Sequence, residues 1–219
     1  MIIAIDGESA TGKSTLAKLL SKKLKFKYLN TGMIYRVLTY YLLKNQIKEN
    51  QLGKIKEALK KIDIKLNFIN HNQRIFIFDK DYTRYINLPL VQKNVSKFSK
   101  IKAVRQVCLK LQRNFAKNNN IIVEGRDIGS VVYPNANIKF FITCDINVRA
   151  KRRFDDLIKT GQNVTLEEVK NDLIARDNND TFRKESPLKI SDGALIIDTT
   201  QKTIQQTLEI MIKYIKEKL

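Results

Sequence analysis

The sequence predicts an α/β fold in which a parallel sheet is covered by helices on both faces. Short runs of β-branched and apolar residues alternate with longer segments of helical periodicity along most of the chain. The first of these runs leads directly into a glycine-containing loop and then into an amphipathic segment. The 43% hydrophobic and 29% charged content is typical of a globular chain. Ligands on such sheets bind at the carboxyl ends of the strands.

The first half of the chain predicts strands that alternate with helices, followed by an insert. A strand over 2–6 is followed by the loop, a helix to about residue 25, a short strand at 27–29 and a helical stripe from Met33 to Leu42. The segment 50–85 differs, because apolar and polar residues alternate at 64–68 and again at 74–78 around a turn that contains His71. It predicts an inserted antiparallel β lobe.

The second half returns to the α/β rhythm after one long helical pattern. That pattern occupies 88–117. Strands are then predicted at 121–123, 138–143 and 194–197, and helices at 146–159, 165–177 and 201–218. The whole chain is therefore expected to form one core domain with inserted lobes, which is in keeping with its 219 residues.

Composition indicates a reduced, cytoplasmic protein. The two cysteines, Cys108 and Cys144, fit neither a disulfide framework nor a metal site. The longest apolar stretches, such as Phe140–Ile142, fall far short of the ~18 residues that a membrane span needs. The N-terminal residues show no basic region or cleavage site of a secretion signal. We expect no membrane partner.

The charge of the chain is strongly positive, with 41 Lys and Arg against 22 Asp and Glu and a net charge of +19. Such an excess raises the possibility of a nucleic-acid partner. However, Lys, Ile and Asn make up 77 of the 219 residues, and all three have AT-rich codons, so genome bias accounts for much of the excess. The lysines are also spread along the whole chain. We therefore expect an affinity for small polyanions and no nucleic-acid partner.

The strongest chemical signal is the sequence G-E-S-A-T-G-K-S-T between the first strand and the first helix, which matches the phosphate-loop pattern. The two glycines permit backbone angles that turn successive N–H groups inward, and the helix N-terminus adds a positive dipole end. Lys13 would reach the β- and γ-phosphates and Ser14 would bind Mg²⁺. The predicted ATP-binding set is Gly7, Glu8, Ser9, Ala10, Thr11, Gly12, Lys13, Ser14 and Thr15.

Arginines gather in the second half of the chain. Arg126 follows a buried strand and so lies at the sheet edge beside the phosphate loop. Of the 11 arginines, five lie between residues 149 and 183. Each group taken singly fits a solvated helix face with ion pairs. Together with the phosphate loop they predict a cage for a transferring phosphoryl group, which needs positioning and positive charge rather than covalent chemistry.

Four blocks of the chain resemble the bacterial-type cytidylate kinases, nucleoside monophosphate kinases of the P-loop kinase fold. In family order they are residues 1–15, Asn30–Arg36 (N-T-G-M-I-Y-R), Gly125–Pro134 (G-R-D-I-G-S-V-V-Y-P) and Arg176–Arg183 (R-D-N-N-D-T-F-R). The third block combined with the fourth is highly specific. The resemblance implies transfer of the ATP γ-phosphoryl group to CMP or dCMP by a monomer, with Mg²⁺ bridging the β- and γ-phosphates.

The resemblance also implies roles for individual residues. Stabilisation of the transferring group falls to Lys13, Arg126, Arg176 and Arg183. The acceptor would be bound by Thr31, Arg36, Ser96, Arg105, Arg126, Asp127, Arg176, Asp180 and Arg183, of which Ser96, Arg105 and Asp127 read the cytosine edge. The family pattern further implies a monophosphate-binding region at 31–117 and a lid at 149–165 that carries Arg149, Arg152 and Arg153 toward ATP.

Four positions depart from the family pattern. Glu8 stands where many members have proline, which is expected to loosen the loop, and Asn30 stands where aspartate is common. Glu124 replaces an aspartate and adds a methylene, and Asn179 stands where an arginine is often found. The arginine set itself is intact, so we expect activity to be retained.

Two rival functions remain open at this point. A kinase of the same fold could act on UMP, AMP or a non-nucleotide acceptor. A nucleic-acid-binding ATPase is the rival of a different class, prompted by the net charge of +19. That class usually carries a second acidic strand motif, whereas Glu124 is the only acid that closes a strongly apolar strand, and it precedes a kinase-like Gly-Arg-Asp.

Overall fold

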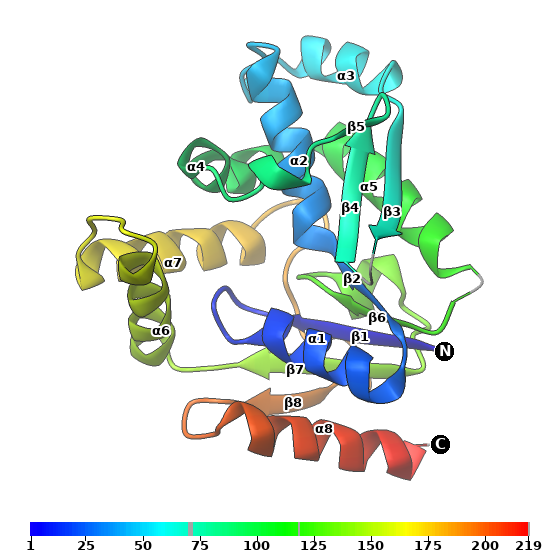
Figure 1. Cartoon of the computed structure of the whole chain (residues 1–219), viewed down its shortest axis with the longest axis vertical. Coiled ribbons are helices and arrows are strands. Elements are labelled where there is room, and N and C mark those ends of the chain that lie inside the picture. The colour runs from blue at the N-terminus through cyan, green and yellow to red at the C-terminus, as the bar shows by residue number, and fades with distance from the viewer. Residues whose placement is uncertain (70–71, 118, 219) are drawn as a thin grey trace. The chain divides into compact units, whose positions relative to one another are not determined.

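The computed structural model describes residues 1–69, 72–117 and 119–218 and divides the chain into two compact units (Figure 1). Unit 1 comprises Met1–Phe26 and Ile121–Leu219, and unit 2 comprises Lys27–Asn120. Unit 2 is thus an insert in the sequence of unit 1, close in extent to the region 31–117 expected to bind the monophosphate.

Unit 1 is built on parallel strands, as predicted. Its strands are β1 (Ile2–Gly7), β6 (Ile121–Glu124), β7 (Ile138–Thr143) and β8 (Leu195–Asp198). They lie in the order β6-β1-β7-β8, and every pairing among them is parallel. Ile3 of β1 is aligned with Ile122 on one side and Ile138 on the other. The run of β-branched residues in β1 is explained by this central position, in which both edges of the strand are paired.

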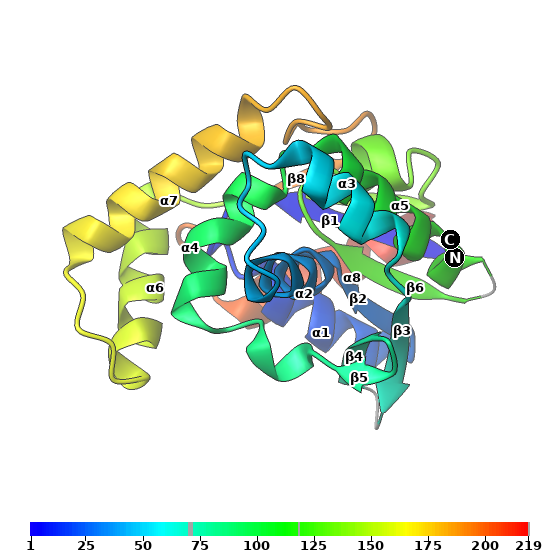
Figure 2. The ribbon, with the colours of Figure 1, turned by 90° about the horizontal axis from the view of Figure 1, so that it is seen from above.

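Helices complete unit 1. They are α1 (Lys13–Leu24), α6 (Ile146–Lys159), α7 (Leu166–Thr181) and α8 (Ile204–Lys218), with a single π-helical turn, η2 (Ile128–Val132), after β6. In Figure 1, α1 and α8 lie beside each other along the strands, and these two helices pack together. Helices α6 and α7, which pack against each other, stand apart from them (Figures 1 and 2). These helices confirm the predicted ones to within a few residues.

The pair α6 and α7 has a small apolar core of its own. Ala150 of α6 is buried against Val169 and Leu173 of α7, and Ala10 of the phosphate loop packs against this cluster. Thr165 begins α7 with a capping box, in which its hydroxyl accepts from the backbone N–H of Glu168 and the Glu168 carboxylate accepts from the backbone N–H of Thr165. The start of α7 is therefore fixed locally, and its packing ties it to the phosphate loop.

Unit 2 combines helices with a small antiparallel sheet. Its elements are β2 (Lys27–Asn30), α2 (Thr31–Lys44), α3 (Leu52–Lys60), β3 (Ile64–Ile69), β4 (Asn72–Ile77), β5 (Lys80–Asp81), η1 (Thr83–Tyr85), α4 (Pro89–Phe98) and α5 (Lys102–Ala116). The sheet order is β3-β4-β5, and Ile64 of β3 faces Ile77 of β4. In Figure 2 the hairpin lies beside α2. The predicted β lobe is confirmed.

Two details of the 50–85 segment differ from the prediction. The segment contains α3, which was not predicted. Its buried residues Ile55 and Leu59 are four apart, a helical spacing, but two apolar positions in a lysine-rich stretch gave only a weak pattern. Residues 72 and 73, which were expected in the turn, belong to β4, and Gln73 is buried there. Its side-chain amide accepts from the backbone N–H of Asn30 at 2.8 Å and donates to the Asn30 carbonyl at 3.1 Å. His71 lies outside the described residues.

The single long helix predicted over 88–117 is wrong, because the chain breaks it into α4 and α5. Phe98 ends α4, and Ile101 adopts an extended backbone before α5 begins. The break keeps Phe98 and Val104 fully buried on either side of it. Helical periodicity reports burial alone, so it did not reveal a three-residue interruption that preserves burial.

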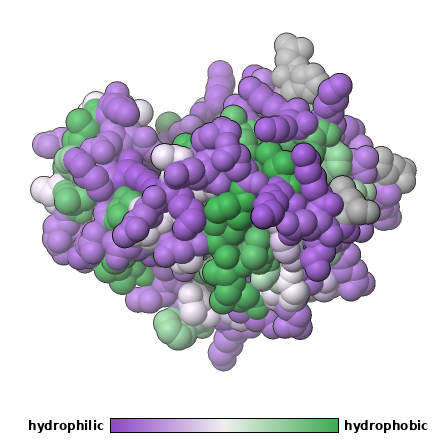
Figure 3. Space-filling model, turned by 90° about the horizontal axis from the view of Figure 1, so that it is seen from below, coloured by the Kyte–Doolittle hydropathy of each residue, from purple (hydrophilic) through white to green (hydrophobic). Residues whose placement is uncertain are grey.

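Cys108 and Cys144, both among the residues that the structure describes, form no disulfide and are buried. Among the described residues, no helix combines the length and the apolar character that a bilayer crossing requires. The face seen in Figure 3 is largely hydrophilic, with a hydrophobic area near its centre and smaller ones elsewhere.

Gly7 is the position at which the backbone leaves least room. Its φ is +143°, and a Cβ added there would lie 1.9 Å from the Ile142 carbonyl oxygen of the neighbouring strand. We expect Gly7→Ala to lower the free energy of unfolding by at least ~2 kcal/mol, because backbone on both sides must shift. Gly53→Ala is the matched control, since nothing lies within 4 Å of a Cβ there. Urea unfolding of both variants should give a large loss for the first alone.

Candidate active site

The phosphate loop joins β1 to α1 in unit 1. Gly12 has φ +89° and precedes the helix, and Ala10 is also left-handed with φ +60°. Within the described part of the chain, no side chain caps the first turn of α1. The free N–H groups and the positive end of the helix dipole therefore face the loop, which is the arrangement that binds phosphate. The predicted loop is present with all of its residues.

Lys13 is buried, with 5% of its surface exposed. Its ammonium donates to the Glu8 carbonyl oxygen and to Thr11 Oγ1, the latter at 3.1 Å. Burial lowers the pKa of Lys13 to about 7, and the positive charge of Arg126 acts in the same direction, although nearby carboxylates oppose it. An incoming phosphate would replace the carbonyl partner and favour the charged form.

Ser14 and Glu124 form a pair of oxygen ligands beside the loop. The Ser14 hydroxyl donates to Glu124 Oε2 at 2.9 Å, and Glu124 is 4% exposed at the end of β6. Hydroxyl and carboxylate oxygens are the ligands that Mg²⁺ takes in phosphate-loop proteins, with phosphates and waters completing its shell. The residues present therefore fit Mg²⁺. Glu124 keeps this contact despite its extra methylene relative to aspartate.

The expectation that Glu8 loosens the loop is not supported by its contacts. Its Oε1 accepts from the Thr143 hydroxyl at 3.3 Å, which links the loop to the end of β7. The backbone carbonyl of Glu8 also accepts from Thr11 Oγ1 at 3.3 Å. Glu8 thus adds a connection that proline could not make.

Asp180 connects two of the predicted arginines. Its Oδ2 accepts from Arg126 Nε at 2.9 Å, and its Oδ1 accepts from Arg183 Nη1 at 3.1 Å. Arg126 also donates to Ser9 Oγ at 2.8 Å, and Arg183 Nη2 lies 3.6 Å from Asp127 Oδ1. Although burial opposes the charged form, the carboxylates of Asp180 and Asp177 raise the pKa of Arg126. The sheet-edge arginine and the α7 block meet at the phosphate loop.

Asp177 is a functional residue that sequence reasoning did not assign. Its Oδ1 accepts from the backbone N–H of Ser9 at 3.0 Å, and its Oδ2 pairs with Arg149. Arg149 is itself buried and donates to the carbonyls of Cys144 at 2.9 Å and Ser9 at 3.1 Å. The carboxylate thereby shapes the loop. Its position three residues before Asp180 on the same helix face was the available signal.

The remaining arginines of α6 and α7 are Arg152, Arg153 and Arg176. Arg152 donates to the Thr199 carbonyl at 3.1 Å and lies 3.6 Å from the sulfur of Cys144. Arg153 is partly exposed on α6. Burial and the charge of Arg153 lower the pKa of Arg176. Two cations whose charges repel in this way favour an anion near them.

Asp6, the last residue of β1 before Gly7, fixes the turn that carries Asp127. Its two carboxylate oxygens accept from the backbone N–H groups of Ile128 at 2.8 Å and Gly129 at 2.7 Å. Burial raises the pKa of Asp6 to about 6, an effect that these two hydrogen bonds reduce. The π-helical turn is therefore anchored to the strand that begins the phosphate loop.

Unit 2 holds the remaining predicted residues in two groups, the first at the start of α2. Asn30 caps this helix, with its side-chain oxygen accepting from the backbone N–H of Met33 at 3.2 Å. Thr31 is buried at the first helical position. A Cβ on Gly32 would lie 2.9 Å from Arg36 Nη1, so the glycine leaves space for that guanidinium. Asn30 performs the capping that an aspartate would perform, without its charge.

The second group surrounds the break between α4 and α5. Ser99 Oγ donates to the Ser96 carbonyl at 3.1 Å, and Arg105 Nη1 donates to the Ser99 carbonyl at 3.1 Å. Arg105 is buried, and its guanidinium lies 5.4 Å from the ring centre of Tyr35. In one continuous helix, residues nine apart would face opposite sides, about 13 Å apart along the axis. The break between the helices therefore lets Ser99 link Ser96 to Arg105 through these two hydrogen bonds.

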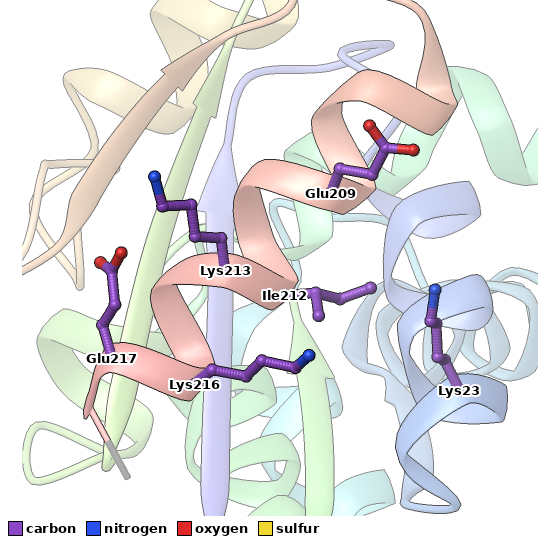
Figure 4. Close-up of a pocket in the computed structure, with 6 residues that line it drawn as sticks. All are labelled: Lys23, Glu209, Ile212, Lys213, Lys216 and Glu217. Carbon is purple, nitrogen blue, oxygen red and sulfur yellow. The ribbon is translucent and has the colours of Figure 1, made fainter.

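A separate pocket of about 370 Å³ lies between α1 and α8 (Figure 4). Figure 4 shows Lys23 of α1 facing Ile212 and Lys216 of α8. Glu209, Lys213 and Glu217 complete its lining. The pocket shares no residue with the phosphate loop or the arginine network, and its mixed charges favour no particular ligand.

Known proteins resemble the chain in sequence and in fold. Residues 3–217 match the family described as cytidylate kinase. A cytidylate kinase of Fusobacterium nucleatum is 41% identical, covering 99% of this chain and 98% of the relative, and one of Thermotoga maritima is 40% identical, covering 99% and 97%. A solved protein of Eubacterium ventriosum, titled uncharacterized, is 17% identical with a TM-score of 0.52, covering 99% and 98%. That structure supports the fold alone.

The pKa of Lys13 predicts how ATP affinity depends on pH. Because phosphate oxygens favour the ammonium form, a pKa of about 7 in the free protein means that binding above pH 7 requires proton uptake. We expect the Kd for ATP to rise between pH 7 and 8.5 by up to ~10-fold per pH unit. Asp6, with a pKa of about 6, is already ionised in this range.

Calorimetric titration with ATP in two buffers of different ionisation enthalpy measures both the Kd and the protons taken up. Lys13→Met serves as the control, since it removes the titrating group and should abolish any uptake. A Kd that stays constant from pH 7 to 8.5, with no proton uptake by the wild type, would contradict this account of Lys13.

Proposed function

The chain belongs to the cytidylate kinase family, and from this premise we propose that it transfers the γ-phosphoryl group of ATP to CMP or dCMP. The products are ADP and CDP or dCDP. The observation that carries the proposal is the convergence of Arg126 and Arg183 on Asp180 beside the phosphate loop. Such an arrangement serves phosphoryl transfer, in which positive charge is needed on the transferring group.

The donor is bound by the phosphate loop. Lys13 contacts the β- and γ-phosphates, and the N–H groups around Gly12 contact the remaining phosphate oxygens. Ser14 and Glu124 would hold Mg²⁺, Glu124 directly or through a water. When bound, the ion neutralises negative charge on the β- and γ-phosphates.

The acceptor phosphate is assigned to Arg36, Arg126 and Arg183. In the free protein Asp180 pairs with two of these arginines. When the acceptor phosphate binds, it replaces Asp180 as a partner of these two arginines in part. The freed oxygen of Asp180 can then accept a hydrogen bond from a sugar hydroxyl beside Arg176. An arginine already held by a carboxylate loses little side-chain freedom when the phosphate arrives.

The cytosine ring is assigned to Ser96, Arg105 and Asp127. A carboxylate and a hydroxyl can accept from the 4-amino group, and a guanidinium can donate to N3 or O2. Ser96 Oγ is buried without a hydrogen-bond partner among the described residues, so a base amino group would satisfy it. Uracil offers a carbonyl and an N–H at the corresponding atoms, which mismatches two of these groups.

The reaction needs no side-chain base. An oxygen of the acceptor phosphate, already ionised at pH 7, attacks the γ-phosphorus, and the bond to the β,γ-bridging oxygen breaks. Lys13, Arg126, Arg176 and Arg183 stabilise the charge on the equatorial oxygens. Three arginines were expected in the lid at 149–165. We assign buried Arg149 to holding the phosphate loop in place, and Arg152 and Arg153 to binding ATP.

Two expectations from the sequence stay predictions. The monophosphate-binding role of 31–117 is supported by the presence of Arg36, Ser96 and Arg105 in this region, and a monomer is the expected state. UMP and AMP remain the alternative acceptors, and no observation favours either of them.

Base selection tests the acceptor assignment. We expect kcat/KM for CMP to exceed that for UMP by at least about 10²-fold, because uracil leaves buried polar groups unpaired. Asp127→Asn should narrow this ratio, since an amide can pair with either base. Steady-state kinetics with each monophosphate give the ratio directly. Equal use of the two bases by the wild type, or an Asp127→Asn variant slowed equally on both, would refute the assignment.

The Mg²⁺ assignment is tested by changing Glu124. We expect Glu124→Gln to raise the Mg²⁺ concentration for half-maximal rate at least ~10-fold, because the carboxylate charge is lost. Glu124→Asp keeps the charge and should stay within ~3-fold of the wild type. Rates measured across a Mg²⁺ series at saturating nucleotides separate the variants. An unchanged Mg²⁺ requirement in Glu124→Gln would show that this carboxylate does not serve the metal.

A further inference from the structure

The positive charge of the chain is concentrated in unit 2. Unit 1 carries 21 Lys and Arg against 17 Asp and Glu, a net charge of +4, whereas unit 2 carries 20 against 5, a net charge of +15. The lysines are spread along the chain, but the acids are not. A genome bias toward lysine acts on both units alike, so it does not explain why acids are scarce in one of them.

The imbalance is greatest around α5. No Asp or Glu occurs between Asp81 and Glu124, a stretch that carries nine Lys and Arg residues. Lys102, Lys110, Arg113 and Lys117 are all exposed, and we call these four residues the α5 basic face. At 100° per residue they lie within about 80° of one another and extend over about 22 Å of helix axis.

The opposite side of α5 belongs to the core of unit 2. Val104 and Cys108 are fully buried, and Gln112 is 1% exposed. The exposed residues of the helix other than the α5 basic face are Gln106 and Asn114. Because the exposed residues of α5 are polar or basic, this surface suits a charged ligand in water better than insertion into lipid.

Most acids of unit 2 are paired with cations outside α5. Four of the five form such pairs: Glu49 with Lys97, Asp63 and Asp79 with Lys65, and Asp81 with Arg74. At the C-terminal end of α5, Lys27 lies 5.7 Å from the ring centre of Phe115 and adds another cation. Helix α3, which packs against α5, exposes three lysines and the fifth acid, Glu57, so its exposed charge is still net positive. The field around the α5 basic face is therefore positive.

We propose that the α5 basic face binds the sugar-phosphate backbone of a nucleic acid strand, independently of base sequence. A row of exposed cations of one sign complements a polyanion of regularly spaced charges. Three of the four cations are lysines, which act as point charges on phosphates rather than as bidentate readers of base edges. This proposal reverses the expectation that the chain has no nucleic-acid partner.

Salt dependence is the first test. Fluorescence anisotropy of a labelled oligothymidylate should give saturable binding whose Kd rises about 50-fold between 50 and 200 mM KCl, the change for four contacts to a single strand. A labelled oligouridylate should bind with a Kd within about threefold, because only backbone is contacted. No saturable binding at 50 mM KCl would overturn the proposal.

A charge-reversal variant locates the binding. Lys102→Glu, Lys110→Glu and Lys117→Glu together should weaken binding at least ~10-fold and flatten the salt dependence. The matched control is Lys189→Glu, Lys202→Glu and Lys216→Glu, which changes three exposed lysines of unit 1 and alters the net charge equally. It should stay within about threefold of the wild type. Equal losses in both variants would mean that total charge, not this face, attracts the strand.

A competition measurement, a vesicle-binding measurement and a folding control separate binding at α5 from binding at the phosphate site or to a membrane. Thermal unfolding followed by circular dichroism checks that the α5 variant is folded. Displacement of the oligonucleotide by CMP or ADP at matched ionic strength would place it in the phosphate-binding site and overturn the proposal. Binding to anionic phosphatidylserine vesicles that is as tight as binding to the oligonucleotide, and that is lost in the same variant, would assign the face to a membrane surface instead.

Discussion

Four cationic side chains gather around the phosphate loop of unit 1, and two carboxylates of α7 hold three of them, the arginines, in place before any phosphate is bound. Asp180 pairs with Arg126 and Arg183, and Asp177 pairs with Arg149. Lys13, the fourth cation, has a lowered pKa, with burial as the main cause and Arg126 adding to it. Without the two carboxylates these like charges would repel, and the side chains would turn toward solvent.

The placement of these two carboxylates depends on several other parts of unit 1. Asp177 and Asp180 face the same side of α7 only while that helix keeps its register. The capping box of Thr165 fixes where α7 begins, and the cluster of Ala150, Val169 and Leu173 holds it against α6. Ala10 packs into the same cluster. The apolar packing of the helical pair and the geometry of the phosphate loop therefore depend on each other.

The sequence was sufficient for the strands, most helices and the phosphate loop, because burial patterns and a local motif encode them. It did not reveal the break after Phe98, since apolar residues on both sides keep the helical period. Nor did it assign Asp177, whose partners Ser9 and Arg149 lie 168 and 28 residues away. Contacts of this kind depend on how elements pack, and no local pattern records them.

The departures from the family pattern show which property each position needs. Asn30 keeps the capping hydrogen bond without a charge, and Glu124 keeps both the charge and the hydrogen bond to Ser14. In unit 1, then, acidic residues are kept at the positions where they bind cationic side chains beside the phosphate loop. In unit 2 the capping position has lost its acid, and the net charge reaches +15. Repulsion among so many positive charges destabilises a compact unit. An anion bound to the α5 basic face would reduce this repulsion.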